Sequence, residues 1–148
     1  MYSKLAFVIV AMLLCIGCGT RFTIESHSME PNLQVGQTIR SIPVDVDKLE
    51  RGDIIIFEHP YHEDEFYAKR LIALPDDTVE IVGGEVFVNG ELLQEDYEIA
   101  PDHPQEQMPQ LLIGAGEFFV LGDNRPNSAD SRWFGPIDAD TIHGRVEE

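Results

Sequence analysis

The sequence predicts a mostly β domain that follows an N-terminal membrane anchor. Three observations support this fold class. The chain begins with an uncharged apolar run, the remainder consists of short runs rich in β-branched and aromatic residues, and Gly, Pro, Asp and Asn separate these runs. Long amphipathic helical patterns are absent. We therefore expect a transmembrane helix over residues 1–20 and one β-rich domain over residues 21–148.

The apolar run extends from Leu5 to Gly19 and contains no charged residue. As a helix it is roughly 22 Å long, whereas the hydrocarbon core of a bilayer is about 30 Å thick, so flanking residues up to Thr20 must contribute to a span. Lys4 precedes the run and an acidic body follows it. This order favours a single-pass cell-membrane protein with an extracytoplasmic body. The alternatives are a cleaved signal sequence and acylation at Cys18.

The composition of the body limits its partners. The 148-residue chain can form one modest core once the anchor is subtracted. Both cysteines, Cys15 and Cys18, lie in the apolar run, so the body has no disulfide. The chain has 27 acidic and 10 basic residues, and its net charge is −17. Such a body is repelled by phosphate backbones, which excludes nucleic acid as an expected partner.

Several runs in the body have the composition of β-strands. In chain order they are DIIIFEH (53–59), FYAKRLIAL (66–74), TVEIV (78–82), EVFVN (85–89) and EFFVLG (117–122), with a further strand beginning near Thr141. Residues 82–93 predict a hairpin, because Asn89 and Gly90 accept the positive φ angles of a tight turn. The segment from Glu95 to Gln110 contains three prolines and is expected to form a surface loop.

Two side chains are candidates for nucleophilic catalysis. Ser28 lies in the segment ESHSMEPNL, shortly after the apolar run. Lys69 lies in a predicted strand whose alternation places Tyr67, Leu71 and Ala73 on the same side. Burial among such side chains lowers the pKa of a lysine, and the neutral amine can then take a proton from a hydroxyl group. Alternatively, Ser28 is a turn residue and Lys69 an edge-strand lysine whose amine reaches solvent.

A third segment, from Val120 to Ile137, is unusually polar for its apolar surroundings. Residues 122–135 include two Asp, two Arg, two Ser and two Asn, between an apolar strand and a Trp-Phe pair. This composition is typical of a half-buried network in which Asp and Arg compensate one another and the hydroxyl groups orient other side chains. A surface turn with incidental ion pairs is the alternative.

Four motifs in this chain resemble those of the bacterial type I signal peptidases, and they occur in the order found in that family. They are SHSMEPNL (26–33), RGDIIIF (51–57), YAKRLIALPDD (67–77) and GDNRPNSADSR (122–132). The resemblance extends from about Glu25 to Gly135, nearly the whole body. It implies a coiled antiparallel β-sheet catalytic domain beside the membrane. It also implies a serine endopeptidase that removes signal peptides from exported preproteins after small residues, at sites of the Ala-x-Ala type.

The resemblance assigns roles to individual residues. It implies that Ser28 is the nucleophile and Lys69 the general base that activates it. Ser26, together with the backbone N–H of Ser28, is expected to stabilise the oxyanion, and Ser128 to orient Lys69. Further residues match supporting positions of the family motifs, and we expect ion pairing among the charged ones. These residues are Met29, Arg70, Gly122, Asp123, Asp130 and Arg132.

Two positions depart from the family pattern. Asn32 stands where the family usually has Thr, and Asp76 replaces the Gly of the usual Leu-Pro-Gly-Asp turn. Asp tolerates left-handed backbone better than most residues, so we expect the turn to form. Neither change removes a catalytic atom.

Other functions fit the sequence less well. One is a Ser-Lys peptidase of the related self-cleaving repressor type, which is soluble and has a DNA-binding partner domain; the apolar run and the full last motif argue against it. Another is a catalytically inactive membrane lipoprotein, against which the presence of both Ser28 and Lys69 argues. A Ser-His pair with His27 is disfavoured, because adjacent residues of an extended chain point to opposite faces.

The segment HPYHEDE (59–65) gathers side chains of the kind that bind metal ions. Its spacing matches no established metal motif, so we interpret it as a solvated loop. No cofactor is expected. The expected partners are the signal peptides of preproteins and, through the N-terminal segment, the lipid bilayer.

Overall fold

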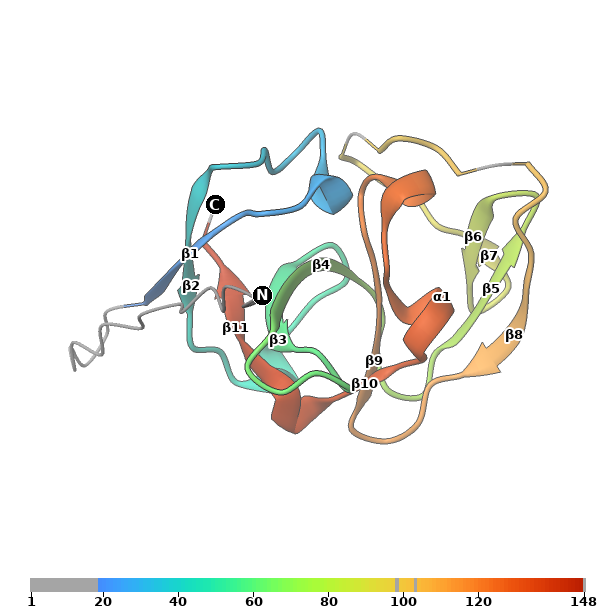
Figure 1. Ribbon diagram of the computed structural model, residues 1–148. Helices are drawn as coiled ribbons and strands as arrows, with labels where there is room; N and C mark the ends of the chain where they lie inside the picture. Colours follow the sequence, from blue (N-terminus) through green and yellow to red (C-terminus); the bar gives the residue numbers. More distant parts are fainter. Residues whose placement is uncertain (1–18, 98, 103, 148) are drawn as a thin grey trace, which may run out of the picture.

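The computed structural model describes residues 19–97, 99–102 and 104–147, which form two antiparallel β-sheets and several short helices (Figure 1). Residues 1–18 of the predicted anchor lie outside the described residues. Thr20, which was predicted to belong to the anchor, begins strand β1 and pairs with Ser41. Within the described ranges, no helix has the length and apolar character needed to cross a membrane.

The larger sheet has seven strands in the order β1-β2-β11-β3-β4-β9-β10, and it curls around the strands at its centre (Figure 1). Its strands are β1 (Thr20–Thr23), β2 (Thr38–Ile42), β11 (Ile142–Val146), β3 (Ile54–Glu58), β4 (Phe66–Ala73), β9 (Glu117–Leu121) and β10 (Ile137–Asp138). Strand β4 pairs with both β3 and β9, so its backbone hydrogen bonds are satisfied on both sides. This central position buries five consecutive residues, Lys69 to Ala73.

The smaller sheet has four strands in the order β7-β6-β5-β8. They are β7 (Glu91–Leu92), β6 (Glu85–Val88), β5 (Thr78–Val82) and β8 (Met108–Leu112). The predicted hairpin is confirmed, because β6 pairs with β7 across Asn89 and Gly90, whose φ angles are 54° and 79°. The predicted turn at Asp76 also forms, with a left-handed φ of 69°.

The core consists of three apolar clusters that meet at β4 and β9 or beside them. Leu71 and Val120 face one cluster, whereas Ile72 and Phe119 face another that includes the inner face of the smaller sheet. The third cluster packs Met29 against β2, β3 and β11. The apolar faces of both sheets are buried in this way, and the segment that carries Ser28 is fixed to the larger sheet through Met29.

The five strands predicted over residues 53–122, and the one near Thr141, are confirmed. Strands β1, β2, β8 and β10 were not predicted. The loop expected from Glu95 to Gln110 is wrong at its end, because β8 begins at Met108. β8 is an edge strand that is mostly exposed, so it lacks apolar alternation, and an edge strand tolerates Pro109 because one side of it needs no backbone donor.

Five short helices connect the strands within the described part of the chain. They are η1 (His27–Met29), η2 (Val46–Lys48), η3 (Arg125–Asn127), α1 (Ser131–Phe134) and η4 (Ala139–Thr141). Three of them, η1, η3 and α1, fall in the first and last of the four motifs. The side chains of the candidate site therefore come from short turns set against the central strand β4.

Candidate active site

Ser28 occupies the middle of the helical turn η1 and is 7% exposed. Met29, which follows it, is buried in the third apolar cluster. The backbone oxygen of Ser28 accepts a hydrogen bond from the backbone N–H of Asn124 at 3.0 Å. The packing of the Met29 side chain and the hydrogen bond to Asn124 fix the position of the Ser28 hydroxyl group.

Lys69 lies in β4, opposite Ile55 of β3, and is 3% exposed. Its Nζ atom donates hydrogen bonds to Ser28 Oγ at 2.8 Å and to the backbone oxygen of Ala68 at 3.0 Å. Burial lowers the pKa of Lys69 to about 8, against the opposing effect of the carboxylates of Asp130 and Asp123. The fold therefore places a lysine with a lowered pKa in hydrogen-bond contact with a serine hydroxyl group.

Ser26 lies just before η1 and is exposed. Its Oγ atom is 3.1 Å from Ser28 Oγ, within hydrogen-bond distance. Ser28 Oγ is thus flanked by a buried amine on one side and by a hydroxyl group at the protein surface on the other. A substrate that approaches from solvent meets Ser26 and Ser28 together.

Asp123 and Arg70 form a buried ion pair behind Lys69. Arg70 donates from Nε to Asp123 Oδ1 at 3.0 Å and from Nη2 to Asp123 Oδ2 at 2.5 Å, and both side chains are at most 5% exposed. Asn32 Nδ2 also donates to Asp123 Oδ2, at 2.8 Å. The departure at position 32 therefore supplies an amide donor to the buried carboxylate, which increases the number of hydrogen bonds that offset its burial.

Asp130 and Arg132 form a second ion pair at the start of α1. Arg132 donates to Asp130 Oδ1 and Oδ2, each at 2.9 Å, and Asp130 Oδ2 also accepts from the backbone N–H of Gly122 at 3.0 Å. Arg132 bonds in addition to Asp102 and to the backbone oxygen of Arg125. These contacts join the two ends of the last motif and hold it as one rigid loop beside η1.

Ser128 lies next to Gly122 in the same loop. An added Cβ atom at Gly122 would contact Ser128 Oγ and would lie 2.5 Å from the backbone oxygen of Ser28, so only glycine fits between these two serines. The Ser128 hydroxyl group is buried and has no hydrogen-bond partner among the described residues. The structure does not join Ser128 to Lys69 by a hydrogen bond, and its orienting role stays a prediction.

Sequence reasoning missed a set of side chains in the segment it interpreted as a surface loop. The Tyr97 ring lies over the Arg70 guanidinium, with 3.8 Å between Arg70 Cζ and the ring centroid. Glu95 pairs with the buried Arg125 and accepts a hydrogen bond from Tyr97 at 2.9 Å. This segment therefore covers the two arginines. The available signal in the sequence was Tyr97, an aromatic residue between the acidic Asp96 and Glu98.

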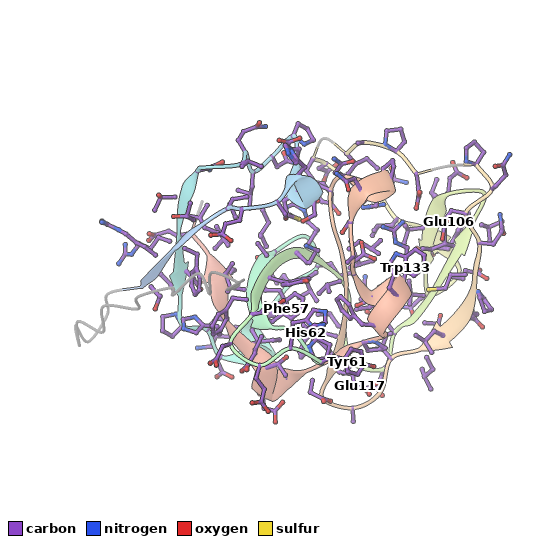
Figure 2. All side chains as sticks on the ribbon, viewed as in Figure 1. Phe57, Tyr61, His62, Glu106, Glu117 and Trp133 are labelled. Carbon is purple, nitrogen blue, oxygen red and sulfur yellow. The ribbon has the colours of Figure 1, made fainter. Side chains whose placement is uncertain are left out.

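Two other candidates lie apart from this site. His27 is directed toward Glu30, with 2.9 Å between its Nδ1 atom and Glu30 Oε1. Its separation from Ser28 arises from the tight turn of η1, in which successive side chains are about 120° apart, and not from an extended backbone as predicted. The loop from His59 to Glu65 connects β3 and β4, and Figure 2 shows Tyr61 and His62 within it. Among the described residues, no group of three or more His, Cys, Asp and Glu is arranged to hold a metal ion.

Comparisons with known proteins identify the family. Residues 1–148 match the family described as signal peptidase, peptidase S26. The chain is 39% identical over 133 residues to a signal peptidase I of Leptolyngbya laminosa. This alignment covers 83% of this chain and 64% of that protein. It is 34% identical over 145 residues to the signal peptidase IB of Staphylococcus aureus, with 86% and 75% of the two chains covered.

A solved structure supports the same conclusion. The crystal structure of a signal peptidase I from Enterococcus faecalis matches this fold with a TM-score of 0.59 and 34% sequence identity. The match covers 68% of this chain and 97% of the other. The resemblance found in the four motifs is confirmed, and the chain belongs to the peptidase S26 family of signal peptidases.

Proposed function

We propose that this protein is a serine endopeptidase that removes signal peptides from exported preproteins, with Ser28 as nucleophile and Lys69 as general base. The single observation that carries this mechanism is the 2.8 Å contact between Lys69 Nζ and Ser28 Oγ inside a buried environment. The names of its relatives support the substrate class, because they are signal peptidases.

In the first half of the reaction, the neutral amine of Lys69 takes the proton of Ser28 Oγ along their 2.8 Å contact. Ser28 Oγ then attacks the carbonyl carbon of the scissile peptide bond and forms a tetrahedral intermediate with a negatively charged oxygen. The Lys69 ammonium gives its proton to the leaving nitrogen. The peptide C–N bond breaks, and the signal peptide stays attached to Ser28 as an ester.

In the second half, Lys69 takes a proton from a water molecule, whose oxygen attacks the ester carbonyl. The ester bond breaks and the proton returns through Lys69 to Ser28 Oγ. The two negatively charged intermediates are stabilised by the Ser26 hydroxyl group and the backbone N–H of Ser28. Ser26 Oγ suits this role because it lies 3.1 Å from Ser28 Oγ and faces the solvent from which substrate arrives.

The remaining motif residues act through position. The Arg70–Asp123 and Asp130–Arg132 pairs fix the strand and the loop that flank Lys69, and the carboxylates keep its pKa from falling further. Ser128, whose hydroxyl group is buried in the same loop, is proposed to orient the Lys69 amine. We further propose cleavage after small residues at Ala-x-Ala sites, with the body on the extracytoplasmic side of the cell membrane.

The proposal is tested with purified full chain and a preprotein that carries an Ala-x-Ala site. We expect cleavage at that site, and we expect Ser28→Ala and Lys69→Ala each to reduce kcat by about 10³-fold or more, because nucleophile and base act as a unit. Tyr61→Phe, a change on the exposed β3–β4 loop, serves as a matched control. Normal cleavage by either active-site variant would refute the assigned roles.

A further inference from the structure

An open hollow of about 440 Å³ adjoins the Ser28 turn and has no part in the mechanism above. Glu30 and Pro31 form one wall, and Ile99 and Ala100 form the other. In Figure 1 the blue segment that follows η1 and the yellow segment near residue 100 approach one another at the top of the view. The volume lies within the range of about 300–1,000 Å³ that binding pockets occupy.

Both walls are fixed to the loop that positions the nucleophile. The backbone N–H of Asn124 donates to Ser28 O at 3.0 Å, and Asn124 Nδ2 donates to His27 O at 3.1 Å. On the other wall, the backbone N–H of Ala100 donates to Asp123 O at 2.9 Å, and that of Arg125 to Ala100 O at 3.2 Å. Consecutive residues of one loop therefore hold the two walls at a set distance from Ser28.

The hollow lies on the side of η1 away from β1. Strand β1 leads through Ile24 to Ser26. If residues 1–18 span the bilayer as predicted from sequence, a signal peptide whose apolar part lies in the same bilayer reaches Ser28 from the β1 side. In Figure 1, β1 lies to the left of η1 and the yellow segment lies to its right. The part of the substrate that follows the scissile bond then extends toward the hollow.

Among the described residues, the lining combines apolar side chains with one carboxylate. Pro31, Ile99 and Ala100 offer no charge, and Glu30 is the ionisable residue of this described lining. The Glu30 side chain is 30% exposed and its described partner is His27, which is 62% exposed, so a substrate in the hollow can reach the carboxylate. A carboxylate in this place attracts a cation and repels an anion.

We propose that this hollow binds the first residues of the mature protein, immediately after the scissile bond, and that Glu30 selects basic over acidic residues there. The inference rests on the proposed function and adds a specificity determinant on the leaving-group side. Cleavage also creates a new α-amino group at this end of the mature chain, which Glu30 attracts once it is protonated.

The test uses three versions of one preprotein that differ only at the second mature residue, which is Lys, Ala or Asp. For the full-length wild type we expect kcat/KM for the Lys version to exceed that for the Asp version about three- to fivefold, as for an exposed charge pair. Glu30→Gln should bring this ratio close to one, and Glu30→Lys should invert it. Glu63→Lys, on the exposed β3–β4 loop, makes the same charge change as a control and should leave the ratio unchanged.

The outcomes separate the two proposals. Cleavage of the Ala version with an equal Lys-to-Asp ratio in wild type and Glu30→Lys would overturn the role of the hollow and leave the proposed function standing. An equal shift of the ratio in Glu63→Lys would overturn it too, because the effect would then arise from overall charge. Failure of the wild type to cut any version would refute the proposed function itself.

Discussion

Lys69 shows how burial changes the acid–base behaviour of an ordinary side chain. A lysine exposed to solvent is almost entirely protonated at neutral pH and cannot act as a base. Lys69 is 3% exposed, and its burial lowers its pKa to about 8. The carboxylates of Asp130 and Asp123 act in the opposite direction, so the two effects together set the pH at which the amine becomes neutral.

We therefore expect the rate of cleavage to rise with pH. The base must be neutral, and the neutral fraction of Lys69 increases as pH rises through about 8. A plot of kcat/KM against pH should be low and rising between about pH 6 and pH 7 and should level off above about pH 9. Measurement over pH 6–10 checks this, and a rate independent of pH across the range would exclude Lys69 as the base.

The Arg70–Asp123 pair leads to a prediction on stability. Asp123→Asn leaves the buried guanidinium of Arg70 without its carboxylate, so we expect a loss of about 3 kcal/mol in the free energy of unfolding. Urea denaturation followed by circular dichroism measures this. The matched control is Glu147→Gln, which removes the carboxylate of the exposed pair with Arg40 and should cost less than about 1 kcal/mol. Equal losses in the two variants would contradict the importance of burial.

Among the elements, the loop between β9 and α1 determines how closely the turn η1 can approach the central strand. At Gly122 the loop passes between Ser128 and the backbone of Ser28, where no Cβ atom fits. The N–H of this glycine also donates to Asp130, so its backbone cannot move away without losing that hydrogen bond. The distance between η1 and β4 thus depends on one residue without a side chain.

Gly122→Ala should therefore impair catalysis more than folding. The added methyl group displaces Ser28 or Ser128, and a misplacement of about 1 Å can reduce the rate by about 10²-fold. Cleavage kinetics and a thermal melt of the same preparation check this. Gly36→Ala is the control, because Gly36 has a positive φ of 84° but open space around it, so that variant should lose stability and keep its rate. Comparable rates for both variants would refute the steric argument.

Burial separates the strands predicted from their composition from β8, which was missed. β3, β4, β5, β6 and β9 each carry buried β-branched or aromatic residues, and their composition alone indicated strands. Strand β8 is exposed at the edge of the smaller sheet, and its pairing with β5 is decided by backbone hydrogen bonds that leave no apolar pattern. The hairpin at Asn89 and Gly90 was predictable because a turn with positive φ angles restricts the residue type.

At the level of the whole molecule, the body is joined closely to the N-terminal apolar segment. Gly19 is the first described residue and Thr20 already belongs to β1. Residues 5–18 of the apolar run lie outside the described residues. In sequence, Gly19 alone separates them from the first strand of the larger sheet. If that run spans the bilayer as predicted from sequence, the sheet edge at β1 lies next to the membrane.

We expect the full chain to remain in the membrane fraction after extraction with alkaline carbonate, since an apolar span resists conditions that remove peripheral proteins. In spheroplasts, added protease should degrade the body, because the sequence predicts an extracytoplasmic position for it. A cytoplasmic marker protein must stay intact in the same sample. Release of the full chain by carbonate would refute the anchor, and protection of the body would refute its orientation.

The local features of this protein follow from its sequence. The apolar alternation around Lys69 allowed a lysine with a lowered pKa, beside the alternative of an edge-strand lysine that reaches solvent. The resemblance of the motifs to the family implied roles for the serines and ion-pairing residues, and these roles stay predictions. The strands and the hairpin could be predicted because periodicity and turn chemistry depend on neighbours along the chain.

The tertiary structure alone decided which side chains meet. Ser28 and Lys69 are 41 residues apart, and their 2.8 Å contact depends on how η1 packs through Met29 against the larger sheet. Tyr97 over Arg70 and the hollow beside Glu30 likewise depend on where a long connection crosses the surface. Such contacts result from strand register, loop path and core packing acting together, and no local pattern of residues encodes their combined effect.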